Sequence, residues 1–191
     1  GSFNHYAIEI DGRTGPSTGP TPEIVPGISC LRSEIAVFGH DANNFPAEPF
    51  ETVTLRALDE AMVTRGTWNA PHVGTGIFNE TGSLTDGVAT YTFPSGEVVA
   101  KFYYNYTNVN LTNDNFEDIN FDIISSSPVQ ADEDPILRMS PVVLRMYNDT
   151  ADGANSIPAQ ISGKASNVPA PNADTLTLQV LTTTPDNPEA C

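Results

Sequence analysis

Apolar and polar side chains alternate with a period of two along much of the chain. Near the N-terminus, Tyr6, Ile8 and Ile10 fall on one face of an extended segment, while His5 and Glu9 fall on the other. Such alternation is typical of a β-strand with one buried face. The same pattern predicts strands at residues 3–10, 34–38, 51–58, 87–93, 98–106 and 118–124, and it shows no long helical stripe.

The turns between these segments are polar and short. The residues "PSGE" at 94–97 separate two of the predicted strands and indicate a β-hairpin. By contrast, "DGRTGPSTGPTPEIVPG" at 11–27 is rich in proline and glycine, which disfavour regular strand pairing, so we expect a loop there. Short strands at this spacing predict an all-β fold in the form of an antiparallel β-sandwich.

The composition changes near residue 126 and suggests a second module. The segment "SSSPVQADEDP" has no apolar period, and it precedes the extended runs "ILRMSPVVLRMYN", "PAQISGK" and "DTLTLQVLTTT". We therefore predict a β-sandwich at 1–127 and a smaller β-rich module at 128–191. The second module is short for an independent core, so we expect it to pack on or follow the first.

Charge excludes some functions. Twenty-four acidic residues face eight lysines and arginines, and the formal net charge is −16. Such a surface repels nucleic-acid phosphates and anionic membranes, so we expect no nucleic-acid partner. No apolar run is long enough to span a bilayer, so no membrane insertion is expected either.

The two cysteines, Cys30 and Cys191, lie far apart in the sequence. If they form a disulfide, the closed loop stabilises the fold by roughly 4–5 kcal/mol in the chain-entropy model. That bond requires an oxidising compartment. The alternative is that Cys30 is a buried thiol and Cys191 has another partner, because sequence alone does not define the distance between the two residues.

The order of several motifs resembles the immunoglobulin-like repeat region of MshQ-like proteins, which are large bacterial surface proteins linked to a type IV pilus. The motifs that carry the resemblance are "FNHY", "GISC", "HDA", "DGVATYTF" and "DPILRM", followed by "QISGKAS" and "TLTLQVL". The resemblance spans nearly the whole chain. The long proline- and glycine-rich insertion at 11–26 departs from the family pattern.

The resemblance implies an immunoglobulin-like sandwich in an exported, extracellular or cell-surface protein. It also implies a non-catalytic structural or adhesive function, with neighbouring modules or pilus subunits as partners. Two alternatives stay open from the residues. One is a carbohydrate-binding domain that recognises glycans through exposed aromatic side chains, for which Trp68, Tyr103, Phe45 and Phe50 are candidates. The other is a self-assembling extracellular filament subunit, which needs an unpaired strand edge.

Clusters of oxygen-bearing side chains make Ca²⁺ the candidate cofactor, because this ion takes six to eight oxygen ligands. The first candidate is Asp132, Glu133 and Asp134 at the predicted junction, where a cation offsets crowded negative charges. Two other clusters are Asp41-Asn43-Asn44 and Asp114-Glu117-Asp118. The alternative for each cluster is a solvated acidic loop.

No catalytic motif is evident, so we expect no enzymatic activity. The chain has three histidines, His5, His40 and His72, and no short metal-binding spacing joins them. The residues "GPSTG" at 15–19 match G-x-S-x-G by letter, but they lie in the proline-rich segment expected to be a loop and not between a strand and a helix, and no S-x-x-K motif occurs. We expect His5 to be a packed or hydrogen-bonded strand residue rather than a base. Glycosylation sequons occur at Asn79, Asn105, Asn110 and Asn148, a number expected by chance in this composition.

Overall fold

The computed structural model describes residues 1–28, 31–80, 86–106, 116–130, 132–140, 142–148 and 176–182. For the last two segments it describes the backbone strands alone. The chain divides into two units, Gly1–Pro141 and Val142–Cys191. All the regular elements among the described residues are β-strands, so the predicted all-β class is confirmed.

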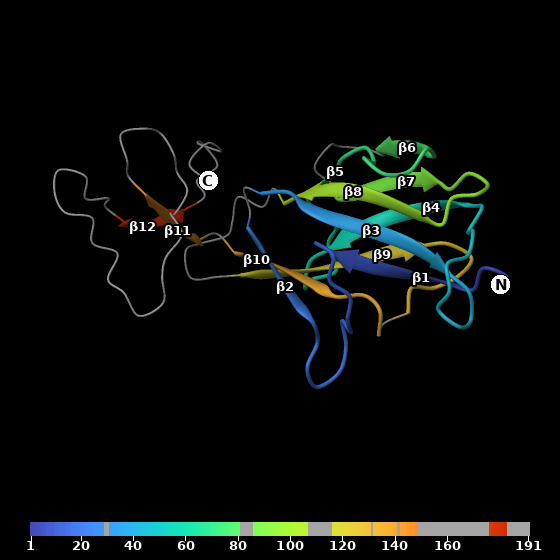
Figure 1. Ribbon diagram of the computed structural model, residues 1–191, viewed down its shortest axis with the longest axis horizontal. Coiled ribbons are helices and arrows are strands. Elements are labelled where there is room, and N and C mark those ends of the chain that lie inside the picture. The colour runs from blue at the N-terminus through green and yellow to red at the C-terminus, as the bar shows by residue number, and fades with distance from the viewer. Residues whose placement is uncertain are drawn as a thin grey trace. The chain divides into compact units, whose positions relative to one another are not determined.

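Two β-sheets make up the first unit (Figure 1). The four-stranded sheet has the order β1-β3-β8-β5, and the six-stranded sheet has the order β2-β10-β9-β4-β7-β6. Among the described pairs, β2 and β10 are parallel and the others are antiparallel. The strands are β1 (His5–Ile10), β2 (Ile24–Ile28), β3 (Ser33–His40), β4 (Thr52–Leu58), β5 (Thr67–Trp68), β6 (Ile77–Glu80), β7 (Val88–Thr92), β8 (Val99–Asn105), β9 (Glu117–Ile124) and β10 (Ile136–Ser140).

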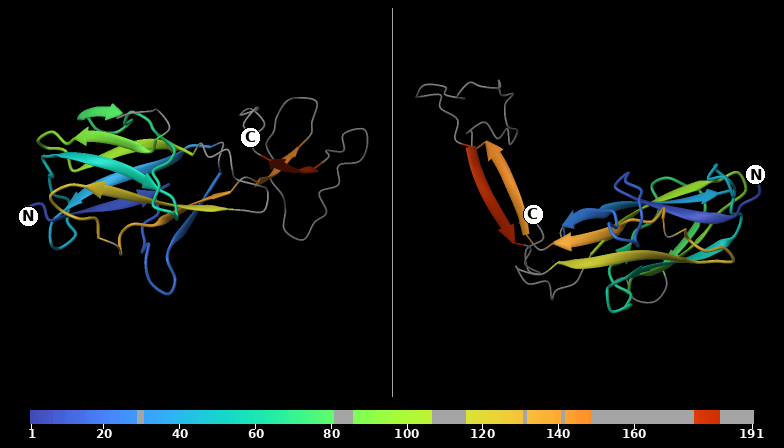
Figure 2. Two further views of the ribbon diagram at one scale, coloured as in Figure 1. Left: turned by 180° about the vertical axis from the view of Figure 1, so that it is seen from behind. Right: turned by 90° about the horizontal axis from the view of Figure 1, so that it is seen from below.

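One hydrophobic core lies between the two sheets (Figure 2). It is built from the apolar faces that the alternation predicts, since Tyr6, Ile8 and Ile10 of β1 are fully buried. The inward residues of β4, Val53, Leu55 and Ala57, belong to the same core, as do Ile119, Phe121 and Ile123 of β9. Two sheets that share one core form the predicted sandwich. The more specific immunoglobulin-like assignment stays a prediction.

The hairpin predicted around residues 94–97 is wrong. Strand β7 pairs with β4 and β6 in the six-stranded sheet, whereas β8 pairs with β3 and β5 in the four-stranded sheet. The two strands face each other across the core, where the rings of Tyr91 and Phe102 meet edge-on with centroids 5.2 Å apart. Each strand carries a full apolar face, and both faces are buried when the strands lie in opposite layers.

A strand also lies within the segment that we expected to be a loop. Strand β2 includes Pro26 and runs parallel to β10 at the edge of its sheet. The Ile136 N–H donates to the Glu23 carbonyl. Backbone groups face alternate sides along a strand, so those of Glu23 and Val25 face β10. The nitrogen of Pro26, which carries no hydrogen, therefore faces away from β10. Proline is compatible with pairing in that position.

The first unit extends further than the predicted boundary at 127/128. Strand β10 lies between β2 and β9 in the six-stranded sheet, and the unit ends at Pro141. The apolar side chains of Leu137 and Met139 are buried in the shared core. The polar segment around residue 126 is thus a connection inside the sandwich.

In the second unit the structure describes one antiparallel pair, β11 (Val142–Asn148) with β12 (Leu176–Thr182). These strands fall within two of the extended runs that the sequence predicts. The third run, at 158–164, lies outside the described residues.

Candidate metal centre

Two histidines far apart in the sequence lie side by side at one end of the four-stranded sheet. His5 is the first residue of β1 and His40 is the last residue of β3, and the antiparallel register places them directly opposite each other. Side chains opposite each other in such a pair are close enough to interact. The two rings meet edge-on, with centroids 5.5 Å apart.

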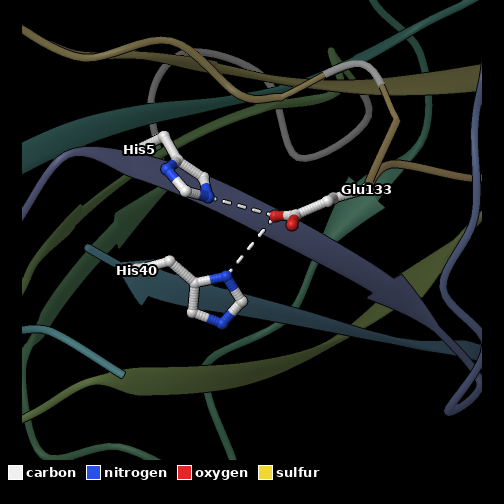
Figure 3. A group of neighbouring side chains, drawn as sticks. All are labelled: His5, His40 and Glu133. Carbon is white, nitrogen blue, oxygen red and sulfur yellow. Dashed lines mark hydrogen bonds and ion pairs between the residues drawn. The ribbon is translucent and has the colours of Figure 1, made fainter. Parts of the chain in front are cut away.

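The connection between β9 and β10 brings a carboxylate to this pair. The Tyr6 N–H donates to the Pro128 carbonyl, and the Gln130 N–H donates to the Tyr6 carbonyl, so this segment runs beside β1. A turn follows, in which the Glu133 N–H donates to the Gln130 carbonyl. These backbone bonds place the Glu133 side chain next to both histidines (Figure 3).

The Glu133 carboxylate contacts both rings through the same oxygen. Its Oε2 lies 3.1 Å from His5 Nε2 and 3.4 Å from His40 Nδ1. His5 is 1% exposed, whereas the side chains of His40 and Glu133 are 18% and 16% exposed. One side of the cluster is therefore closed by protein and the other side reaches the surface.

Hydrogen bonding restricts the state of the buried ring. His5 Nδ1 lies 3.1 Å from Asn4 Oδ1, so both ring nitrogens face an oxygen. A neutral imidazole has one N–H donor and one lone pair. If Nδ1–H donates to Asn4, the Nε2 lone pair points at the carboxylate, and that contact is favourable only with a proton or a cation between the two atoms. The cluster can therefore share a proton or bind a cation.

The loop after His40 is held close to β3 by its own interactions. A Cβ atom at Gly39 would lie 2.3 Å from the Ala47 carbonyl oxygen, so only glycine allows this close approach. Asp41 accepts hydrogen bonds from the N–H groups of Asn43 and Phe45. These bonds lower the pKa of the Asp41 carboxyl group. Asp41, a member of one predicted calcium cluster, thus stabilises the turn.

The three acids of the predicted junction cluster have different surroundings. Glu133 lies against the histidines, Asp134 accepts a hydrogen bond of 2.8 Å from Ser17 Oγ, and Asp132 is exposed. Burial raises the pKa of Asp134 to about 6. In the third predicted cluster, Asp114 lies outside the described residues.

The other members of that third cluster pair with arginines. Asp118 accepts two hydrogen bonds of 2.7 Å from Arg138. Glu117 lies 3.6 Å from the Arg65 guanidinium group. Both carboxylates thus have cationic neighbours from the protein itself.

The cysteines and the sequon asparagines differ in whether the structure describes them. Cys30, Cys191 and Asn110 lie outside the described residues, and the structure describes only the backbone of Asn148. Asn79 is exposed on β6. Asn105 Oδ1 accepts a hydrogen bond of 2.8 Å from Asn69.

The predicted aromatic platform is not a single surface. Trp68 is 2% exposed and belongs to the core, so this candidate is not part of an exposed sugar-binding surface. The Tyr103 ring stacks on His72 at 4.2 Å and has the Arg32 guanidinium group 3.8 Å from its centroid. Phe45 and Phe50 are exposed in the loop between β3 and β4.

The three residues of the cluster are far apart in the sequence, so the short spacings that define metal motifs do not join them.

The described part of the chain contains no helix of the length and apolar character that a bilayer crossing needs.

Comparisons with known proteins do not assign a family. No family model matches the chain, and no curated protein matches it. Among solved structures, a human F-spondin reeler domain is similar with a TM-score of 0.39 and 11% identity, covering 73% of this chain and 93% of that one. A structure of the Reelin-N domain of F-spondin has a TM-score of 0.36 and 14% identity, covering 72% of this chain and 82% of that one. These TM-scores are too low to imply a shared function.

Proposed function

We propose that the chain is a non-catalytic, load-bearing module pair of an exported bacterial surface protein of the MshQ-like type. In this function the first unit is a stiff spacer between neighbouring modules, and it acts outside the cytoplasm. The observation that carries the proposal is the position at which the chain enters and leaves the first unit.

The chain enters the first unit at one end and leaves it at the other. His5 pairs with His40, the last residue of β3. At the exit, Ser140 pairs with Ile28, and the Leu31 N–H, two residues before the first residue of β3, donates to the Ile28 carbonyl. Strand β3 has eight residues, so the two ends are separated by about 25 Å. Figure 1 shows the N-terminus and the end of β10 on opposite sides of the unit.

This arrangement suits the transmission of tension. Interstrand hydrogen bonds lie across the strand direction. A pull between the two ends therefore loads many bonds of β1 and β10 at the same time, and β10 is held by β2 and β9 on its two sides. A pull on two strands from one end instead breaks their bonds one after another. The first geometry is expected to withstand the larger force.

Single-molecule pulling on the full chain tests the proposal. Handles are attached through a genetically encoded reactive amino acid at residue 1 and at Ser140, and in a second variant at residue 1 and at Asn44. The second pair loads β1 and β3 from the same end, because Asn44 follows His40 by a short turn. Both are measured in a chelator.

We expect a clearly higher unfolding force for the end-to-end pair than for the pair with both handles at one end. Equal forces, or a higher force for the second pair, would refute the load-bearing function.

A further inference from the structure

We propose that His5, His40 and Glu133 bind one Zn²⁺ ion. The three side chains offer two imidazole nitrogens and one carboxylate oxygen, and one such atom from each lies within 4.8 Å of the other two. Zn²⁺ accepts this mixed set of ligands, whereas Ca²⁺ and Mg²⁺ take oxygen ligands. The donor set therefore points to a different ion from the calcium that the acidic residues suggested.

Two of the three separations between the donor atoms match those of tetrahedral zinc, and the third is within 4.8 Å. With metal–ligand bonds of about 2.0–2.1 Å, two neighbouring ligands of a tetrahedral ion lie about 3.3–3.4 Å apart. The distances from Glu133 Oε2 to the nitrogens of His5 and His40 are 3.1 and 3.4 Å. Small side-chain movements are sufficient to accommodate the ion.

The buried ligand is already oriented. Metal-bound histidines commonly donate their other ring N–H to a protein oxygen, which fixes the ring and its tautomer. Asn4 Oδ1 is placed for this bond at 3.1 Å from His5 Nδ1, and the His5 ring is almost fully buried. The Nε2 lone pair then points towards Glu133. The same contact without a cation requires either a proton on both ring nitrogens or the other tautomer with the Asn4 amide turned round.

The surface side of the cluster provides access for the ion. His40 and Glu133 are partly exposed, so the ion can enter from solvent and a water molecule can complete its coordination. The net charge of −16 also favours the accumulation of cations near the protein.

Bound zinc would join three segments that are distant in the sequence. His5 begins β1, His40 ends β3, and Glu133 lies in the connection between β9 and β10 of the other sheet. The ion would thus connect the two layers at the end where the chain enters. An ion that binds the folded state alone stabilises it in proportion to the logarithm of its concentration relative to Kd.

Zinc titration of the full chain, freed of metal with a chelator, tests the site. His40→Gln and Glu133→Gln each remove one donor, and both residues are partly exposed, so the fold is expected to survive. His72→Gln is the matched control, since His72 Nε2 also contacts a carboxylate oxygen, 2.7 Å away on Glu34, without a second histidine. Calorimetry measures Kd, thermal melts measure stability, and Co²⁺ absorption reports tetrahedral coordination.

We expect zinc to raise the melting midpoint of the parent chain and of His72→Gln equally. Each ligand variant should bind zinc at least tenfold more weakly and lose the tetrahedral Co²⁺ spectrum. Absence of a zinc effect in the parent chain would overturn the proposal, as would unchanged zinc affinity in both ligand variants. A stabilisation by Ca²⁺ in place of Zn²⁺ would also overturn it. The pulling experiment is done in chelator, so its outcome and this one are independent.

Discussion

A buried carboxylate in the turn after β4 allows a quantitative test of the electrostatics. Asp59 is 2% exposed and accepts hydrogen bonds from the Val63 N–H at 2.8 Å and from Arg65 Nε at 2.5 Å. The Arg65 guanidinium group also lies 3.6 Å from Glu117. Replacing Arg65 with methionine keeps an unbranched apolar stem and removes the positive charge between two carboxylates.

We expect Arg65→Met to lower the free energy of unfolding at pH 7 by about 2–3 kcal/mol. Removing one partner of a buried ion pair costs about 3–5 kcal/mol. Arg65 is 36% exposed, so water replaces part of its interaction with Asp59 and the cost falls below that range. The control is Arg56→Met, because Arg56 pairs with Asp122 and both side chains are about one-third exposed. An exposed pair of this kind contributes about 0–1 kcal/mol.

The cost should depend on pH. Burial alone would raise the pKa of Asp59, but the bonds from Val63 and Arg65 outweigh it and the pKa of this carboxyl is lowered. A lowered pKa stabilises the fold above the unfolded value of about 3.9, and the contribution disappears as the pH falls through the folded pKa. Burial raises the pKa of Glu117, and Arg65 opposes that rise. Without Arg65, the negative charges of Asp59 and Glu117 destabilise the fold at pH 7. Protonation of the two carboxyl groups removes this destabilisation.

Urea unfolding followed by circular dichroism at pH 7 and at pH 3.5 measures both effects. The deficit of Arg65→Met relative to the parent chain should shrink at the lower pH. A deficit no larger than that of Arg56→Met, or one that is the same at both pH values, would refute this reasoning.

Two further predictions concern single side chains. Trp68→Phe should cost about 2–3 kcal/mol, because it leaves a cavity in the core and removes the indole hydrogen bond to the Gly87 carbonyl; a loss below about 1 kcal/mol in urea unfolding would contradict this. Phe50 has a φ of 45° and is 70% exposed, whereas Phe45 is 64% exposed without a positive φ. Both glycine variants lose an exposed ring, but Phe50→Gly also relieves strain, so it should be more stable than Phe45→Gly by about 1 kcal/mol. Equal stability of the two variants would exclude strain at this position.

The alternation of side chains predicts which faces are buried but not which strands are neighbours. Tyr6, Ile8 and Ile10 face the core as predicted, since period two is a local property of the strand. Pairing depends on the whole sandwich. The strands around residues 94–97 look like a hairpin because they are adjacent and both amphipathic, yet each pairs within a different sheet. The proline and glycine content places Pro26 in a loop, whereas the compatibility of this proline with a strand depends on which side of β2 is paired.

The histidine cluster could be anticipated only with the strand register. His5 lies near the start of the alternating segment 3–10, and His40 follows the alternating segment 34–38 by two residues, which is the one signal in the sequence. In the sequence Glu133 belongs to the acidic run Asp132-Glu133-Asp134. Its contacts instead come from the backbone bonds that hold residues 128–130 beside Tyr6, and these are not visible in the pattern of residue types.

The position of Pro26 has a consequence for how copies of this protein behave at high concentration. Strand β2 is an edge strand of the six-stranded sheet. Pro26, in the middle of this strand, lacks the backbone N–H that a strand added at this edge would need for pairing. Molecules at high concentration are therefore protected there from pairing between the sheets of two copies. Any polymer of this chain formed by strand addition has to grow elsewhere, for example along the four-residue strand β6 at the opposite margin of the same sheet.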